Sequence, residues 1–395
     1  MLSQKTIDIV KSTVPVLEQH GKTITTVFYK NMFEAHPELL NIFNHANQSR
    51  GRQQTALANA VYAAAANIDN LGAILPTVIQ IAHKHRSLGI MPEHYPIVGE
   101  NLLGAIKEVL GGAATPEIID AWAEAYGVIA DAFIGVEKEM YDKVEEADGG
   151  WRTFKKFTIA QKVKESDVIT SFYLKPVDGK KLPSYKPGQY ITIRLNIFGE
   201  KYTLNRQYSL SQAPNEEMFR ISVKREDECT PNGKVSVHLH RNLNVGDEIE
   251  VSAPAGDFYL DTESTAPVTL ISGGVGLTPM MAMYETIAKE TPERQVAFLH
   301  SARTRKHQAF DQTLRDMNES LPNSTYEVLY SEEGDGFINV EFLSKYAIKG
   351  SDVYVCGPTP FMNAVISALH EIGFTDDKIH FEFFGPAEQL ELVQA

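Results

Sequence analysis

The sequence predicts a multidomain protein in which an all-helical domain is followed by an antiparallel β-barrel and a doubly wound α/β domain. Two observations support this division. The chain has 395 residues, which is long for one compact core. The spacing of its apolar residues also changes twice, from helical periodicity to short strands and then to strands alternating with helices. We therefore expect domains at residues 1–146, 151–261 and 266–395.

Composition and charge exclude several classes of protein. Hydrophobic residues make up 43% of the chain and charged residues 22%, which is typical of a globular protein. There are 37 Lys and Arg against 51 Asp and Glu, and the net charge of −14 disfavours binding to nucleic acid or anionic membranes. Two cysteines, Cys229 and Cys356, are too few for a disulfide framework. With no long apolar run and no signal-peptide pattern at the N-terminus, we expect a cytoplasmic protein without membrane insertion.

Helical periodicity in the first domain singles out one histidine. Apolar residues recur every three or four positions up to Glu146, and prolines stand where helices would begin. In the helix expected to begin near Pro76, His85 falls on the apolar stripe. His83, about 200° away around the helix, should face elsewhere. A lone histidine on an apolar face is more often a core residue than a metal ligand, so His85 alone does not decide the function.

Other residues of this domain could line a pocket around that histidine. Gln53 and Leu57 lie four positions apart on an alanine-rich helix, which sets one polar group beside an apolar lining. Tyr29 stands among apolar and aromatic residues, and Phe43 follows a proline break. Taken singly, each of these residues is compatible with ordinary core packing.

The second domain carries a short motif suited to a flavin dinucleotide. From Phe154 to about Leu260, short β-rich runs alternate with turn residues, which favours a small antiparallel barrel. A cation for diphosphate, an aromatic ring and a hydroxyl occur together in Arg206, Gln207, Tyr208 and Ser209. Tyr190 lies upstream, and Gly233 could open a helix whose N–H groups face a pyrophosphate. The motif alone is also compatible with an ordinary strand.

The third domain contains a glycine-rich turn between a strand and a helix. The strand is Val268–Ser272, and the turn consists of Gly273, Gly274, Val275, Gly276, Leu277, Thr278 and Pro279. Glycines let backbone amides approach a phosphate, and we expect Thr278 as the helix N-cap with Pro279 at the first helical position. A turn without a ligand is the alternative. A later strand ends in Cys356, Gly357 and Pro358, at the edge where open parallel sheets bind ligands.

Taken together, the motifs resemble those of the bacterial flavohaemoglobin family, in which a globin is fused to a ferredoxin–NADP reductase-type module. The resemblance extends over practically the whole chain. In the helical part it rests on the order Tyr29, Phe43, Gln53, Leu57, His85, Tyr95 and Glu137. It implies haem b with His85 as the proximal iron ligand, FAD, and NADH or NADPH as the electron donor.

The same resemblance implies a role for each residue. Tyr29 and Gln53 would stabilise iron-bound O₂, Tyr95 and Glu137 would hydrogen-bond around the proximal histidine, and Phe43 and Leu57 would line the haem pocket. Lys84 and Glu382 would tune redox potentials, although a solvated surface lysine is an equal alternative for Lys84. FAD would contact Tyr190, Arg206, Gln207, Tyr208, Ser209, Phe383, Phe384, Gly385 and Pro386. The nicotinamide dinucleotide would contact Gly273, Gly274, Val275, Gly276, Leu277, Thr278, Pro279, Cys356, Gly357 and Pro358.

The activity implied by the resemblance is that of a nitric oxide dioxygenase. Electrons would pass from NAD(P)H to FAD to haem, and NO and O₂ would be converted to nitrate. Because the reductase is on the same chain, no obligate protein partner is expected. Two other classes stay open, a haem-based O₂-binding or sensing protein and a flavin reductase acting on hydroperoxides, quinones or ferric chelates. The choice between NADH and NADPH also stays open, since a 2′-phosphate could be held by Ser301, Arg303, Arg305 and Lys306.

Overall fold

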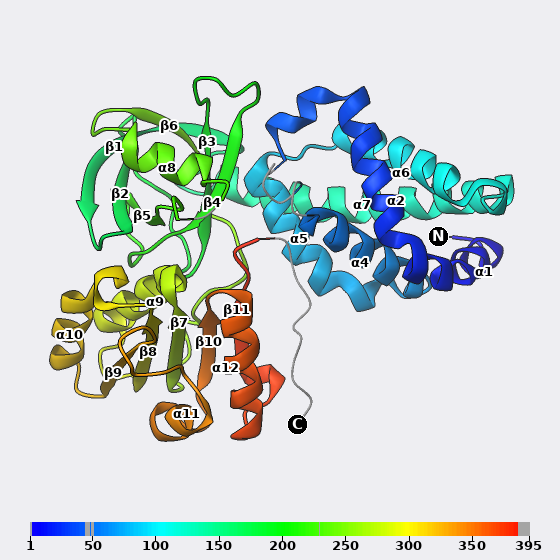
Figure 1. Cartoon of the computed structure of the whole chain (residues 1–395). Coiled ribbons are helices and arrows are strands. Elements are labelled where there is room, and N and C mark those ends of the chain that lie inside the picture. The colour runs from blue at the N-terminus through cyan, green and yellow to red at the C-terminus, as the bar shows by residue number, and fades with distance from the viewer. Residues whose placement is uncertain (1, 44–47, 49–50, 229, 386–395) are drawn as a thin grey trace.

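The computed structural model describes residues 2–43, 48, 51–228 and 230–385, and Figure 1 shows three domains. A helical domain lies on one side of the molecule, and the β-barrel and the α/β domain lie one above the other on the other side (Figure 1). The predicted order of fold classes along the chain is confirmed. Among the described residues, no helix combines the length and the apolar character that a membrane span requires.

The helical domain begins its helices at prolines, as its sequence predicts. Pro15, Pro76 and Pro116 occupy a first or second helical position, where a backbone N–H has no partner to lose. The long apolar faces bury a common core that includes Phe28, Met32 and Trp122. The helices are α1 (Gln4–Ser12), α2 (Val14–Ala35), α4 (Arg52–Ala66), α5 (Leu75–Leu88), α6 (His94–Leu110) and α7 (Pro116–Glu146). Short 3₁₀ turns lie at Pro37–Asn41, Leu71–Ile74 and Gly111–Ala113.

The second domain is an antiparallel sheet whose edges approach each other. The strands are β1 (Phe154–Lys164), β2 (Ile169–Pro176), β3 (Tyr190–Leu195), β4 (Leu204–Ser209), β5 (Phe219–Lys224) and β6 (Glu248–Ser252). Their order is β4-β3-β6-β1-β2-β5, and every pair is antiparallel. A bridge between Leu210 and Ile221 links the ends of β4 and β5, so the sheet curls into a barrel. The helix α8 (Lys234–Arg241) follows Gly233, where the sequence predicts a helix to open.

The third domain is a parallel sheet with a reversal of strand order at its centre. The strands are β7 (Val268–Gly273), β8 (Val296–Ala302), β9 (Ser324–Tyr330), β10 (Asp352–Cys356) and β11 (Ile379–Glu382), in the order β11-β10-β7-β8-β9. The helices are α9 (Leu277–Glu290), α10 (Asp311–Ser320), α11 (Val340–Tyr346) and α12 (Thr359–Glu371), with 3₁₀ turns at Gly274–Gly276, Arg305–His307 and Asp376–Lys378. Because β8 and β10 flank β7 on opposite sides, the carboxyl ends of β7 and β10 open a crevice at the switch point.

One local prediction in this domain is wrong. Thr278 is not the N-cap of α9, because the helix already begins at Leu277 with Gly276 at its N-cap. The turn Gly274–Gly276 is itself a 3₁₀ helix that runs directly into α9, so helical geometry starts before Thr278. The Thr278 hydroxyl therefore donates backward to the Val275 carbonyl at 3.0 Å and caps no N–H group.

The end of α5 joins the helical domain to the barrel. The Gln207 amide of β4 donates to the Ser87 hydroxyl at 2.9 Å, and the Asn205 amide donates to the carbonyl of Asn41 at 2.8 Å. Arg86 is fully buried at this junction and donates to a backbone carbonyl of the barrel. Several of these groups are buried, and the hydrogen bonds between the domains satisfy polar atoms that docking removes from water.

The glycine-rich turn generates a prediction about stability. A methyl group at Gly276 would lie 2.2 Å from the Cys356 carbonyl oxygen, whereas at Gly274 it would enter open space with φ at +56°. We expect Gly276→Ala to lower the free energy of unfolding by roughly 3 kcal/mol, because two backbones must separate. Gly274→Ala, the matched control, should cost about 1 kcal/mol through its left-handed conformation alone. Equal midpoints of thermal unfolding for the two variants would contradict this account.

Candidate functional site

A cavity of about 700 Å³ lies where the helical domain meets the barrel. Its walls are mainly aliphatic and aromatic, with a few polar groups that converge on it, as in many cofactor sites. Most residues that the sequence predicts for the first domain line this cavity, namely Tyr29, Phe43, Gln53, Leu57, Lys84, His85 and Tyr95. His83 does not line it, and instead its Nδ1 accepts from the backbone N–H of Gly256 at 3.3 Å.

His85 is held by a buried carboxylate. Its Nδ1 lies 2.7 Å from Oε1 of Glu137, and the Tyr95 hydroxyl donates to the same oxygen at 2.6 Å. Glu137 is only 3% exposed, so water competes little for this carboxylate oxygen. Because Nδ1–H donates to the carboxylate, the lone pair of the ring resides on Nε2, the nitrogen left to coordinate a metal. Burial and the neighbouring Glu137 raise the pKa of Tyr95, so its hydroxyl stays a donor.

Two aromatic residues of α7 contact the group formed by His85, Tyr95 and Glu137, and the sequence analysis missed both. The Phe133 ring lies 5.8 Å from the ring of His85 and 6.4 Å from that of Tyr95. The Tyr126 hydroxyl donates to the Tyr95 carbonyl at 2.6 Å. Both residues lie at helical spacing from Glu137, four and eleven positions earlier, so the periodicity of α7 contained the signal.

A second group of polar donors faces the cavity from α2 and α4. Tyr29 is 7% exposed and packs edge-on against Phe28 at 4.8 Å and Phe43 at 5.9 Å. Within the described residues its hydroxyl makes no hydrogen bond, and burial raises its pKa, so it is a neutral donor. The Gln53 Oε1 accepts from Gln48 at 2.8 Å, which leaves its amide N–H groups as donors.

The barrel motif divides between two environments. Arg206 and Gln207 line the cavity beside His85, and Arg206 donates to the Asn205 carbonyl at 2.7 Å. Tyr208 packs against the barrel core, and Ser209 is buried at the end of β4. The division falls between the first two and the last two residues of the motif, so it follows how the barrel docks on the helical domain and not the alternation of side chains along a strand. Tyr190 is also buried, and its ring lies where a methyl group on Gly256 would stand.

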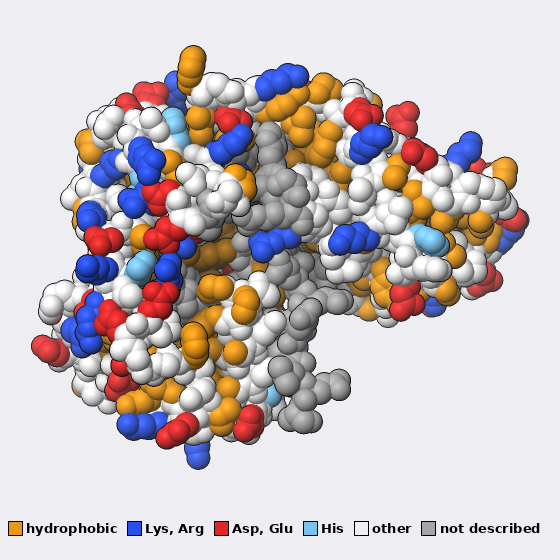
Figure 2. Space-filling view, in the orientation of Figure 1, with side chains coloured by type: hydrophobic (Ala, Val, Ile, Leu, Met, Phe, Trp, Pro, Cys, Tyr) orange, Lys and Arg blue, Asp and Glu red, His pale blue; other side chains and the backbone are white. Residues whose placement is uncertain are grey.

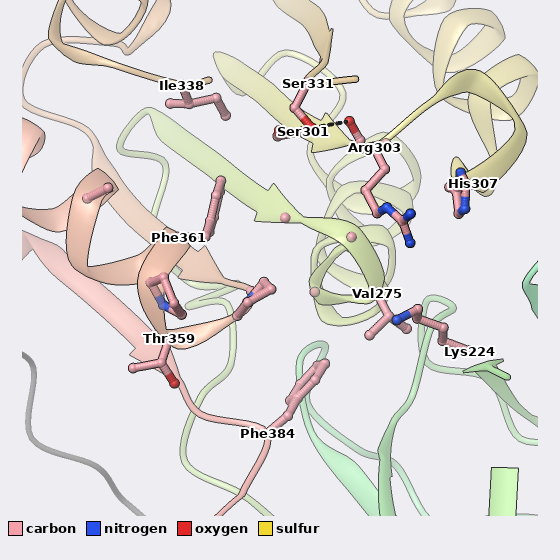
Figure 3. Close-up of a pocket in the computed structure, with 18 of the residues that line it drawn as sticks. Lys224, Val275, Ser301, Arg303, His307, Ser331, Ile338, Thr359, Phe361 and Phe384 are labelled. Atoms are coloured by element: carbon pink, nitrogen blue, oxygen red, sulfur yellow. Dashed lines mark hydrogen bonds between the residues drawn. The ribbon is translucent and has the colours of Figure 1, made fainter. Parts of the chain in front are cut away.

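A second cavity, of about 820 Å³, lies between the barrel and the parallel sheet. Arg303, His307 and Lys224 lie on one side of it, and Phe361, Thr359 and Phe384 lie on the other (Figure 3). The sequence-predicted residues that line it are Gly273, Gly274, Val275, Gly276, Gly357, Pro358, Phe383, Phe384 and Gly385. The backbone amides of the glycine-rich turn therefore border a large pocket at the switch point of the sheet.

Four of the predicted dinucleotide residues do not line this pocket. Leu277, Thr278 and Cys356 are fully buried, and Pro279 is buried beside them. Burial raises the pKa of the Cys356 thiol, and its Sγ donates to the Glu382 carbonyl at 3.6 Å, so it stays protonated. Pro386 lies outside the described residues. Phe361, which sequence reasoning missed, packs under Gly273 and Gly357.

Lys84 connects the helical domain to the end of the third domain. Its Nζ donates to the Gly385 carbonyl at 2.8 Å and lies 4.0 Å from Oε1 of Glu382. The side chain of Lys84 is 20% exposed and that of Glu382 is 11% exposed, so neither is an ordinary solvated charge. Burial raises the pKa of Glu382 to about 7, and the nearby ammonium opposes this shift. Gly385 lines both cavities, so they meet at this contact.

Comparison with known proteins accounts for all three domains. The chain matches the globin family over residues 26–133, the oxidoreductase FAD-binding domain over 156–259, and the oxidoreductase NAD-binding domain over 270–367. The fold and the two cavities thus define an oxidoreductase in which a globin is joined to a flavin and nicotinamide reductase module.

Full-length relatives identify the family. The flavohemoprotein of Bacillus thuringiensis is 54% identical, and the match covers 99% of this chain and 100% of the relative. The crystal structure of a flavohemoglobin from Malassezia yamatoensis, with bound FAD and heme, has a TM-score of 0.85 at 30% identity and covers 97% of this chain and 100% of its own. The FAD/NAD-binding domain of a nitric oxide dioxygenase from Vibrio cholerae is 39% identical over 59% of this chain and 99% of its own, with a TM-score of 0.55. This chain belongs to the flavohemoprotein family.

The buried carboxyl of Glu382 predicts a pH-dependent stability. In the unfolded chain it ionises near its ordinary pKa of 4.5, whereas in the folded protein it stays protonated up to about pH 7. Stability is therefore lost as the pH rises from about 4.5 to about 7, by up to roughly 3 kcal/mol. We expect the thermal midpoint of Glu382→Gln, relative to the unaltered protein, to rise between pH 5 and pH 8.

The matched control for this experiment is Glu371→Gln, because Glu371 is exposed at the end of α12. Its midpoint should follow that of the unaltered protein at every pH. A Glu382→Gln difference that stays constant from pH 5 to pH 8 would show that this carboxyl is already ionised in the folded protein at low pH.

Proposed function

We propose that this protein is a cytoplasmic nitric oxide dioxygenase that converts NO and O₂ to nitrate with electrons from NAD(P)H. The observation that carries the proposal is the junction of the two cavities. The cavity around His85 is closed in part by Asn205, Arg206 and Gln207 of the barrel, and it meets the second cavity at Gly385. A protein that only stored or sensed O₂ would have no use for the second cavity, and a reductase alone would have no use for the first.

The residues of the first cavity fit haem b. Among the described residues Nε2 of His85 has no hydrogen-bond partner, apolar walls surround the imidazole, and no carboxylate lines the cavity. We assign His85 Nε2 as the iron ligand. Bound haem supplies the iron at which O₂ and NO react, and bound FAD converts two-electron hydride transfer into one-electron steps.

The chain's own groups control the chemistry at that iron. Glu137 keeps the proton on Nδ1 of His85 and makes the imidazole a stronger electron donor. Tyr29, neutral and without another partner among the described residues, can donate a hydrogen bond to a ligand that carries partial negative charge. Gln53 adds a second donor, and Leu57 and Phe43 restrict the space and exclude water.

The reductase half supplies the electrons in this proposal. The turn Gly273–Gly276 and the strand end at Gly357 would bind the nicotinamide dinucleotide through backbone amides. FAD would lie against Tyr190, Tyr208 and Ser209 of the barrel and against Phe383 and Phe384 of the last segment. The Lys84 contact with Gly385 holds this last segment against α5, the helix that carries His85, and this would keep the electron path between FAD and haem short.

Removing the iron ligand tests the proposal directly. His85→Ala should lose the haem Soret band and produce no nitrate when NADH-reduced, oxygenated protein is mixed with NO in a stopped-flow instrument. Tyr29→Phe should keep its haem and slow nitrate formation by about 100-fold, through loss of one preorganised donor. The control is His20→Ala, since His20 lies on α2 and does not line the cavity. Nitrate yields unchanged by His85→Ala would refute the haem mechanism.

The carboxylate behind His85 has a separate expected effect. Glu137→Gln keeps the shape of the side chain and removes its charge, so we expect haem to bind and turnover to fall about tenfold. The iron–histidine stretching frequency of the reduced protein, measured by resonance Raman spectroscopy, should fall as well. Glu139→Gln, at an exposed position of the same helix, should leave both unchanged. A frequency unaltered by Glu137→Gln would show that the carboxylate does not polarise the ligand.

A further inference from the structure

Two arginines follow the end of β8, and the first of them, Arg303, borders the second cavity. In open α/β sheets the residues at this position contact the adenosine ribose of a bound dinucleotide. An acidic group there accepts from the 2′-hydroxyl of NAD, or an arginine binds the 2′-phosphate of NADP. Arg303 directly follows β8 and lines the cavity together with Ser301 and His307 (Figure 3). From sequence alone such an arginine is compatible with a phosphate site.

The structure shows that carboxylates engage both guanidinium groups. Arg303 donates through Nε to Glu332 at 2.7 Å and through Nη1 to Glu228 at 2.8 Å. Arg305 lies 3.2 Å from Glu333, which also accepts from the Arg305 backbone N–H at 2.8 Å. Glu332 and Glu333 belong to the turn after β9, and Glu228 belongs to the barrel, so the carboxylates come from both domains that flank the cavity.

The ion-paired cluster itself holds one more negative than positive charge, although Arg52 also lines the cavity and Lys306 follows Arg305 in the sequence. Three carboxylates face two guanidinium groups, and Lys224 on the same side of the cavity is paired with Glu226 at 3.0 Å. On the visible face of the barrel and the α/β domain, acidic and basic side chains are interleaved (Figure 2). A 2′-phosphate, with close to two negative charges, would have to displace carboxylates that stay nearby. The neutral 2′-hydroxyl of NADH can instead donate to one of them.

We propose that Glu332 and Glu333 are specificity-determining residues that make the second cavity select NADH over NADPH. The inference rests on the proposed use of that cavity for a nicotinamide dinucleotide. The carboxylates act by neutralising Arg303 and Arg305, so they discriminate against the phosphate by repulsion. Since Arg303, Glu228 and Glu332 are each about half exposed, their ion pairs add little to stability, and neutral variants should fold.

The experiment compares NADH and NADPH as donors for reduction of ferricyanide by the FAD-loaded full-length protein, an assay that needs neither NO nor O₂ chemistry. The unaltered protein should favour NADH in kcat/KM by at least about tenfold. In the double variant Glu332→Gln, Glu333→Gln, kcat/KM for NADPH should rise about tenfold, through KM, while that for NADH changes less than about threefold. Added salt should reduce this gain.

Two further variants separate the explanations. Adding Arg303→Gln to the double variant should abolish the gain with NADPH, because the freed guanidinium is what binds the phosphate. Glu319→Gln, an exposed position on α10, should alter neither donor. Comparable use of both donors by the unaltered protein, or an unchanged ratio in the double variant, would overturn the selectivity proposal alone. Failure of both donors to reduce the FAD would overturn the proposed function as well.

Discussion

A single hydrogen bond, from Nδ1 of His85 to the buried carboxylate of Glu137, is the constraint on which the first cavity depends. It fixes the tautomer of the imidazole, so that Nδ1 donates to the carboxylate and Nε2 keeps the lone pair that can coordinate a metal. The carboxylate is itself held by Tyr95, which accepts from Tyr126 through its backbone carbonyl. A chain of contacts across α6 and α7 thereby sets the direction of one side chain on α5. An imidazole held this firmly is preorganised for a ligand role, whereas a core histidine would need only burial.

The same turn of α5 also ties the three domains together. Successive helical residues point about 100° apart, so Lys84, His85, Arg86 and Ser87 reach different neighbours. Lys84 contacts the last segment of the α/β domain, His85 faces the cavity, and Arg86 and Ser87 bond to the barrel. The position of the metal-ligand candidate relative to the reductase is therefore determined by the residues next to it in sequence. A shift of this helix would move the histidine and all of its domain contacts at once.

Much of this arrangement could be predicted from sequence because its signals are local. Periodicity placed His85 on an inward face and His83 on the opposite one, and both placements are found in the structure. What could not be predicted depends on contacts between domains. No local pattern indicates that Lys84 is covered by Gly385, or that Arg206 faces the helical domain, since both depend on how the barrel docks. The error at Thr278 has a similar origin, because the compact 3₁₀ turn before it is shaped by packing against β10.

In the glycine-rich turn, most of the glycines are required by packing and not by the binding of a ligand. Of its glycines, Gly274 has the left-handed conformation that glycine alone adopts easily, and its surroundings are open. Gly273 and Gly276 have ordinary conformations, and they lack side chains because Phe361 and the Cys356 carbonyl occupy the space that a methyl group would need. Packing against α12 at Gly273 and against the end of β10 at Gly276 therefore accounts for two of the three glycines without any ligand. The binding role of the turn rests instead on its backbone amides, which this packing brings to the edge of the cavity. Packing and binding thus select the same residues, because a turn that fits tightly under the strand ends is also one whose amides a phosphate can reach.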